Sequence, residues 1–122
     1  MHFERDPATE ANAIVGCDEA GLRLRAAAYA GSVIVTRDRV IHPWRPAPVG
    51  QLAIEDFAAL LEQPPELLLL GTGATQRMPL PALYAAFAAR GIGLEAMDNR
   101  AACRTYNLLL SEYRNVAAAI LF

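Results

Sequence analysis

The chain has 122 residues, of which 54% are apolar, and a formal net charge of −2. This length can bury one hydrophobic core, so we expect a single domain over residues 1–122 with a flexible start at 1–12. The charged side chains make up 20% of the chain and are scattered, so we expect no nucleic-acid partner. The chain has 11 arginines and no lysine. Without lysine it cannot form a Schiff base or bind phosphate in the Walker manner.

The amino terminus and the cysteines bear on location. Met1–Asn12 is polar and lacks the basic start and apolar run of a signal peptide. No stretch approaches the roughly 18 consecutive apolar residues that a membrane-spanning helix needs. We therefore expect a cytoplasmic protein without membrane insertion, in which Cys17 and Cys103 are free thiols.

Residues 13–46 have the pattern of β structure. We expect strands at Ile14–Cys17, Leu22–Arg25, Val33–Val35 and Val40–Ile41, with a turn at 18–21. Leucine alternates with arginine over 22–25, which predicts one solvent-facing side and antiparallel pairing. Three prolines between positions 43 and 48 end this portion, because proline cannot donate to a strand ladder.

The middle of the chain predicts a helix, a strand and a second helix. The first helix has Ile54, Phe57, Ala58 and Leu61 on one face and ends at Pro64. Leu67–Leu70 is apolar throughout, as expected of a central strand covered on both faces. The second helix has Pro79 and Pro81 in its first turn, a buried stripe of Leu83, Phe87 and Ala88, and a cap at Gly91.

The last third predicts a parallel crossover unit. Leu94–Met97 is a strand, Asp98 or Asn99 caps the following helix, and Val116–Phe122 is an apolar terminal strand. The inward positions of that helix are Ala102, Tyr106, Leu109 and Tyr113. We therefore expect an α/β fold with a central mixed, mostly parallel sheet, helices against it and an antiparallel amino-terminal β portion.

A candidate site lies where the two predicted parallel strands end. Gly71, Thr72 and Gly73 form a turn whose backbone amides can hold an anion, although a plain tight turn is the alternative. The third glycine of a dinucleotide fingerprint is missing. Arg77, Arg100 and Arg104 can converge on a carboxylate or phosphate, or simply be solvated.

Three further polar residues, Asp98, Asn99 and Asn107, belong to this crevice. Asp98 can act as an acid or base or only cap its helix, and Asn107 is a site residue or a structural clamp. The candidate ligand-binding residues are Gly71, Thr72, Gly73, Arg77, Asp98, Asn99, Arg104 and Asn107. Trp44, between prolines, anchors its loop against the core or forms an exposed patch.

No catalytic or metal-binding signature is complete. Cys103 lies near a helix start, where the helix dipole can lower the pKa of a thiol, although a buried apolar role is the alternative. The two histidines and two cysteines offer no pair at ligand spacing, and neither serine lies in a nucleophile elbow. We predict no catalytic residue, no metal and no cofactor.

Four segments together resemble a family of uncharacterised bacterial and archaeal proteins that includes a mitochondrial assembly factor of respiratory complex I. They are 67–73, 93–99, 102–109 and 112–119, and the resemblance runs from about Gly31 through Pro43 and Trp44 to the end. It implies the Mth938-like fold, a three-layer α/β arrangement with a central mixed sheet. It implies no enzymatic reaction or cofactor and suggests a protein-interaction role.

The chain departs from this family at two positions. Tyr113 stands where many relatives have glycine, which predicts a different geometry in the turn before the last strand. Ala53 stands where relatives often have serine or threonine, which removes a helix cap worth about 1 kcal/mol.

Three hypotheses of function follow. The first is a non-enzymatic interaction domain that binds a protein partner and assists assembly of respiratory complex I or another membrane complex. The alternative is a domain or enzyme that binds a small molecule or anion in the crevice at the Gly-Thr-Gly turn. The third is self-association through an edge strand, and the sequence leaves the oligomeric state open.

Overall fold

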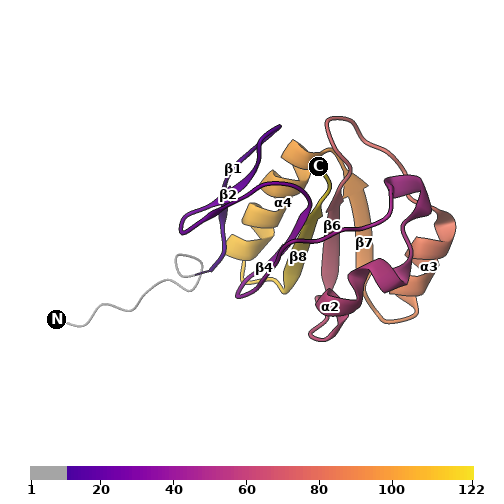
Figure 1. The fold of residues 1–122 in the computed structure, drawn as a ribbon. Coiled ribbons are helices and arrows are strands. Elements are labelled where there is room, and N and C mark those ends of the chain that lie inside the picture. The colour runs from indigo at the N-terminus through magenta and orange to yellow at the C-terminus, as the bar shows by residue number, and fades with distance from the viewer. Residues whose placement is uncertain (1–10) are drawn as a thin grey trace.

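Two β-sheets organise residues 11–122, the part of the chain that the computed structural model describes (Figure 1). The smaller sheet has the order β1-β2-β3 and is antiparallel. Its strands are β1 (Ile14–Asp18), β2 (Gly21–Leu24) and β3 (Ala28–Tyr29). In β2, Leu22 and Leu24 are buried while Arg23 is exposed, which confirms the predicted solvent-facing side.

The larger sheet has the order β5-β4-β8-β6-β7. Its strands are β4 (Val33–Thr36), β5 (Val40–Ile41), β6 (Leu67–Gly71), β7 (Gly93–Met97) and β8 (Val116–Ile120). Strand β6 lies parallel to β7 and β8, whereas β4 is antiparallel to β8 and β5. The mixed sheet is as expected, and the amino-terminal β portion divides between both sheets.

The helices lie on the two faces of the larger sheet and complete a three-layer α/β fold (Figure 1). They are the 3-10 turns η1 (Val49–Gln51) and η2 (Ile54–Phe57), and the α-helices α2 (Ala58–Leu61), α3 (Pro81–Ala88) and α4 (Asn99–Ser111). Helix α4 and the smaller sheet cover one face, and η2, α2 and α3 cover the other.

Strands β6 and β8 are buried on both sides, and the leucines of β6 illustrate this. Leu69 belongs to the core under α4, while Leu68 and Leu70 belong to the core that contains Phe57 and Phe87. This alternation, with every one of these leucines fully buried, confirms the predicted central strand.

The segment 54–61 differs from the predicted helix. Its first half is a 3-10 turn, in which residues three apart lie above one another, so Ile54, Phe57 and Leu60 point inward. Ala58 is consequently exposed, and the expectation that it shares the buried face was wrong.

Two other predicted inward positions are also exposed. Helix α3 begins at Pro81, so Pro79 lies outside the first turn in which it was expected. The helix ends at Ala88, whose side chain is exposed beyond the buried Phe87. Helix α4 ends at Ser111, so Tyr113 lies outside it and is 59% exposed, while Leu110 packs inward instead.

The turn after α4 has a backbone conformation that suits glycine. Tyr113 has φ of 60°, in the left-handed region. The Arg37 guanidinium lies 5.9 Å from the centre of the Tyr113 ring and donates to the Leu110 carbonyl. These contacts hold the turn against the end of β4.

The segment 42–48 is anchored to the core, the first of the two alternatives for Trp44. Trp44 is 8% exposed, its ring centre lies 5.4 Å from that of Phe57, and its indole Nε1 donates to the Asp56 carbonyl at 2.8 Å. The expected flexible start at 1–12 lies mostly outside the described residues. Asn12, which is described, has its carbonyl bound by the Tyr106 hydroxyl at 2.8 Å.

Candidate functional site

A groove of about 1240 Å³ opens beside the carboxyl ends of β6 and β7, where the sequence placed the candidate crevice. Five of the eight candidate residues line it: Thr72, Gly73, Arg77, Asp98 and Asn99. The other walls come from the β1–β2 turn at 17–20, the segment 46–49, Ser32, Ala74, Arg100 and the chain end at 121–122. Of these residues, Arg100 was proposed from the sequence; the walls from 17–20, 32, 46–49 and 121–122 were missed because these segments are distant in the chain.

The backbone amides of the Gly-Thr-Gly turn are engaged within the protein. Thr72 N donates to the Met97 carbonyl at 2.8 Å, and Gly73 N donates to Asn99 Oδ1 at 2.9 Å. Thr72 Oγ1 accepts from Arg77 N and lies 2.9 Å from the Thr75 carbonyl, to which it donates. The amides of Thr72 and Gly73 are therefore not free to hold an anion.

Asn99 ties the turn to the end of the central strand. Its Oδ1 accepts from Gly73 N, and its Nδ2 donates to the Leu121 carbonyl at 2.8 Å. A Cβ on Gly71 would lie 2.5 Å from that Oδ1, so Gly71 is buried behind the turn and makes room for the clamp. Asp98 caps α4, since its Oδ1 accepts from Ala101 N at 2.9 Å.

The remaining two candidates lie in a neighbouring cavity of about 200 Å³ that is shallow and widely open to solvent. Arg104 and Asn107 line it together with Ile14–Cys17, Arg100 and Cys103. Asn107 is a structural clamp here, because its side chain bonds both the N and the O of Ile14. Arg100 and Cys17 line both cavities, so the two are adjacent.

Three arginines at these cavities lack an acidic partner within residues 11–122. They are Arg77 and Arg100 in the groove and Arg104 in the smaller cavity. The ion pair found in this part of the chain joins Arg23 to Asp18 instead. These guanidinium groups can therefore bind a carboxylate or phosphate without first breaking an ion pair within residues 11–122.

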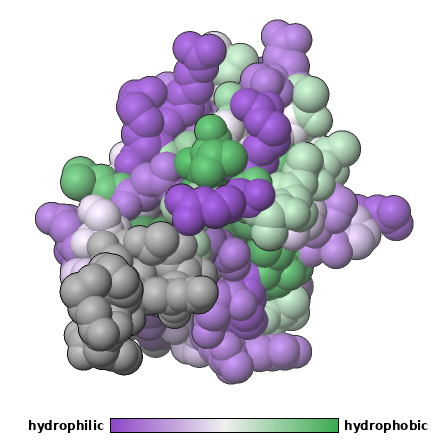
Figure 2. All heavy atoms as spheres, turned by 90° about the vertical axis from the view of Figure 1, so that its left-hand side faces the viewer, coloured by the Kyte–Doolittle hydropathy of each residue, from purple (hydrophilic) through white to green (hydrophobic). Residues whose placement is uncertain are grey.

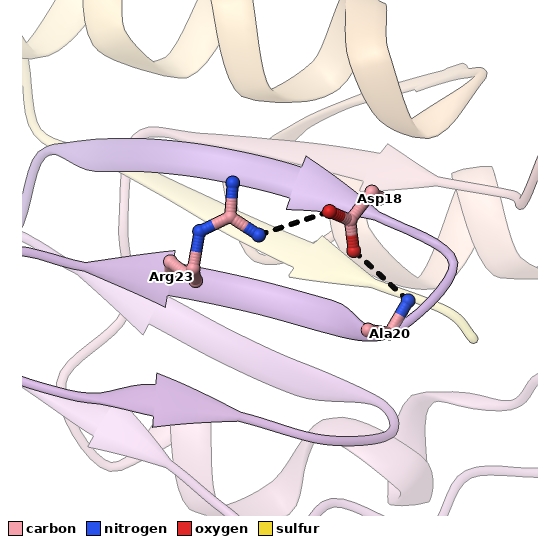
Figure 3. A network of polar contacts seen from close by, with 3 residues as sticks. All are labelled: Asp18, Ala20 and Arg23. Atoms are coloured by element: carbon pink, nitrogen blue, oxygen red, sulfur yellow. Dashed lines mark hydrogen bonds and ion pairs between the residues drawn. The ribbon is translucent and has the colours of Figure 1, made fainter.

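Asp18, at the rim of the groove, was predicted only as a turn residue. Its Oδ2 lies 3.0 Å from Arg23 Nη1, and its Oδ1 accepts from Ala20 N at 2.9 Å (Figure 3). The Arg23 hydrogen bond, followed by the Ala20 amide, holds the pKa of Asp18 below its ordinary value. The charge of this carboxylate is thus largely committed to the hairpin.

Cys103 does not have the lowered pKa that a helix start would favour. It is the fifth residue of α4, beyond the first turn where the dipole acts, and is only 6% exposed. Burial, with the neighbouring Cys17 thiol adding to it, raises the pKa of Cys103 well above its ordinary value. Among residues 11–122, no three His, Cys, Asp or Glu side chains are grouped to hold a metal ion.

The outer face of the smaller sheet is chemically mixed. Figure 2 shows the side of the molecule that carries β1 and β2, where hydrophilic residues lie between the strongly hydrophobic ones. Val15 in β1 is 58% exposed. In the stretch 11–122, no helix has the length and apolar composition needed to cross a bilayer.

This arrangement of layers defines the class of the domain. A protein of Bordetella pertussis, described as a Mth938-like domain, superposes with a TM-score of 0.78 at 28% identity, covering 99% of this chain and 92% of that one. The solution structure of a Xanthomonas campestris protein gives a TM-score of 0.80 at 38% identity, covering 99% and 92%. The fold is therefore that of Mth938-like domains, as the resemblance implied.

The chain belongs to the family described as protein of unknown function (DUF498/DUF598), whose model matches residues 14–121. It is 38% identical over 81 residues to NADH dehydrogenase (ubiquinone) 1 alpha subcomplex assembly factor 3 of Danio rerio, covering 64% of this chain and 46% of that protein. It is 39% identical over 62 residues to the 13 kDa major membrane protein of Francisella tularensis, covering 51% and 50%. The chain thus spans about half the length of these two relatives.

Proposed function

We propose that this protein is a non-enzymatic interaction domain that assists the assembly of respiratory complex I through contact with a protein partner. The observation that carries the proposal is the 38% identity to a complex I assembly factor over 81 residues. That alignment reaches only 46% of the relative's length, so the proposal concerns a role of the shared domain.

The groove supports binding more than catalysis. Asp98, Asn99 and the Thr72 hydroxyl, the groups best suited to chemistry there, all have internal hydrogen-bond partners. Apolar surface at its rim includes Phe122, which is 44% exposed. A partner segment can bury that surface while its carboxylates pair with Arg77 and Arg100.

Deleting the gene in its own host tests the assembly role. We expect less intact complex I on native gels and a lower NADH:ubiquinone activity, both restored by the wild-type chain. A chain with Arg77→Glu and Arg100→Glu should restore neither, whereas Arg90→Glu, a change at an exposed position just after α3, should restore both. Normal complex I content in the deletion strain would refute the role.

Cytoplasmic location is part of the same proposal. In an assembly role the protein would bind at a membrane complex without inserting a helix. Such peripheral binding is compatible with the name of the Francisella tularensis relative, a major membrane protein. Cell fractionation in increasing salt tests this. We expect release from membranes by salt, and retention until detergent is added would argue against it.

A second candidate is the binding of a small anion in the groove. Its specific support is the groove of about 1240 Å³ with Arg77 and Arg100 free of acidic partners in residues 11–122. Titration with nucleotides, phosphates and carboxylates should then shift the amide resonances of Thr72, Gly73, Arg77 and Asp98 together. If none of these resonances moves, the candidate is discarded.

A further inference from the structure

The two cysteines of this chain lie close together in the folded protein. Cys17 is in β1 and Cys103 is in α4, yet both line the same cavity of about 200 Å³. Both are free thiols, Cys17 half-buried and Cys103 buried. Cys17 also packs against the hydrophobic core to which Cys103 belongs.

Cys17 and Cys103 are neighbours because β1 packs on α4. The Asn107 clamp fixes Ile14 beside the third turn of α4. Cys17 lies three residues beyond Ile14, and Cys103 lies one helical turn before Asn107, so the two segments run past each other in opposite directions. The clamp therefore holds the two thiols in register.

The charged side chains that line this smaller cavity are both positive. Arg100 and Arg104 line the cavity with the cysteines, and neither has an acidic partner in the described part of the chain. The Arg104 charge opposes the rise in the pKa of Cys103, while the Cys17 thiol interacts with that of Cys103 directly. Cys17, the more accessible of the two, also borders the large groove.

We propose that Cys17 and Cys103 form a thiol–disulfide exchange site that takes a small anionic disulfide of the glutathione class. The Cys17 thiolate attacks one sulfur of the disulfide, which releases one thiolate and leaves a mixed disulfide on Cys17. Cys103 then displaces the second thiolate and forms the Cys17–Cys103 bond. Two protein thiols are oxidised, one disulfide is reduced to two thiols, and the two protons pass to the released thiolates.

The product would tie β1 covalently to α4. Because Cys17 borders the groove, the oxidised protein has a fixed β1–β2 turn at the groove wall. Arg100 and Arg104 attract the carboxylates of the incoming disulfide, so they set the preference for an anionic reagent. Cys17 and Arg100 also line the groove of the proposed assembly role, but the thiol chemistry is measured on the purified chain and does not rest on that role.

Incubation of the purified full chain with oxidised glutathione, followed by acid quenching and intact-mass analysis, tests the site. We expect a monomer that has lost the mass of two hydrogen atoms, with peptide mapping joining Cys17 to Cys103 and a raised Tm. Persistent free thiols, a lasting mixed disulfide in the wild type, or a disulfide between two molecules would each overturn the proposal. This result needs no variant and is unaffected by a folding defect.

Variants test the order of attack and the role of charge. Cys103→Ala should stop at the mixed disulfide on Cys17, and Cys17→Ser should react far more slowly. Arg100→Gln with Arg104→Gln should slow the reaction with oxidised glutathione about threefold or more. The same variant should react with uncharged hydroxyethyl disulfide at the wild-type rate, and equal slowing with both reagents would overturn the charge argument.

Discussion

The Asn107 side chain pairs with both backbone groups of Ile14. Its Oδ1 accepts from Ile14 N at 2.9 Å, and its Nδ2 donates to the Ile14 carbonyl at 2.8 Å. A helix side chain thus supplies the two hydrogen bonds that a neighbouring strand would otherwise provide to β1. This contact joins the smaller sheet to the main body of the protein.

Replacing Asn107 should therefore loosen β1. Asn107→Ala leaves two partly buried backbone groups unpaired, and we expect a loss of about 2 kcal/mol in the free energy of unfolding. Urea denaturation measures this change, and hydrogen exchange should accelerate first in β1. The control is Asn115→Ala, an exposed asparagine, for which we expect a change within about 0.5 kcal/mol. Equal effects at both positions would contradict the clamp.

Gly71→Ala should destabilise the protein through Asn99. The new Cβ would lie 2.5 Å from Asn99 Oδ1 and 3.0 Å from Ile120 Cδ1, so the bonds to Gly73 and Leu121 must shift or break. We expect a cost of about 2 kcal/mol by chemical denaturation. Gly50→Ala, which meets nothing within 4 Å, should change stability by no more than about 0.5 kcal/mol. A matching loss at Gly50 would show that loss of glycine, rather than the close approach, is responsible.

Ala53→Ser should stabilise the start of η2. Ala53 is the N-cap, with extended φ of −124° and ψ of 165°, and no side-chain cap bond exists there. A serine hydroxyl can accept from an amide of the first turn, which should add about 1 kcal/mol to the free energy of unfolding. The control, Ala59→Ser within α2, should instead cost about 0.5 kcal/mol. Thermal melts of both variants measure the difference, and a fall in Tm for Ala53→Ser would count against the cap.

Asp18 should titrate below its ordinary pKa, because Arg23 and the Ala20 amide favour its charged form. A group with a lowered folded pKa stabilises the protein above its unfolded pKa, and this contribution is lost as pH falls through the folded value. Carboxyl-detected NMR titration measures the shift. Arg23→Gln should move the pKa of Asp18 back toward its ordinary value, whereas Arg90→Gln should leave it unchanged. An unchanged Asp18 pKa in Arg23→Gln would exclude Arg23 as the main cause.

Local sequence was sufficient to predict most elements of the fold. The central strand at 67–70 and the leucine–arginine alternation of 22–25 were predicted correctly, and the helix cap is Asp98, one of the two residues proposed for it. Each of these patterns depends on neighbours within a few residues, such as the period of a strand or the unpaired amides at a helix start. The inward orientation predicted for Ala58 and Tyr113 was wrong. Both residues lie near the ends of elements, where packing decides the type of helix and the residue at which it ends.

The candidate site was predicted only in its position. The strand exits placed Thr72 and Gly73 at one edge of a sheet, and the structure has a groove there. Whether a polar side chain faces a ligand or clamps the chain depends on its partners. The partners of Asn99 and Asn107 are Leu121 and Ile14, far away in the sequence.

By itself, the sequence determined the α/β class, the buried strands and the family resemblance, because hydrophobic periodicity and turn chemistry act over short distances. Only the tertiary structure decided that β8 lies between β4 and β6. It likewise decided that the amino-terminal strands divide between two sheets and that Cys17 lies beside Cys103. These features depend on contacts between residues far apart in the chain, and such contacts are chosen by the burial of whole faces rather than by any local pattern.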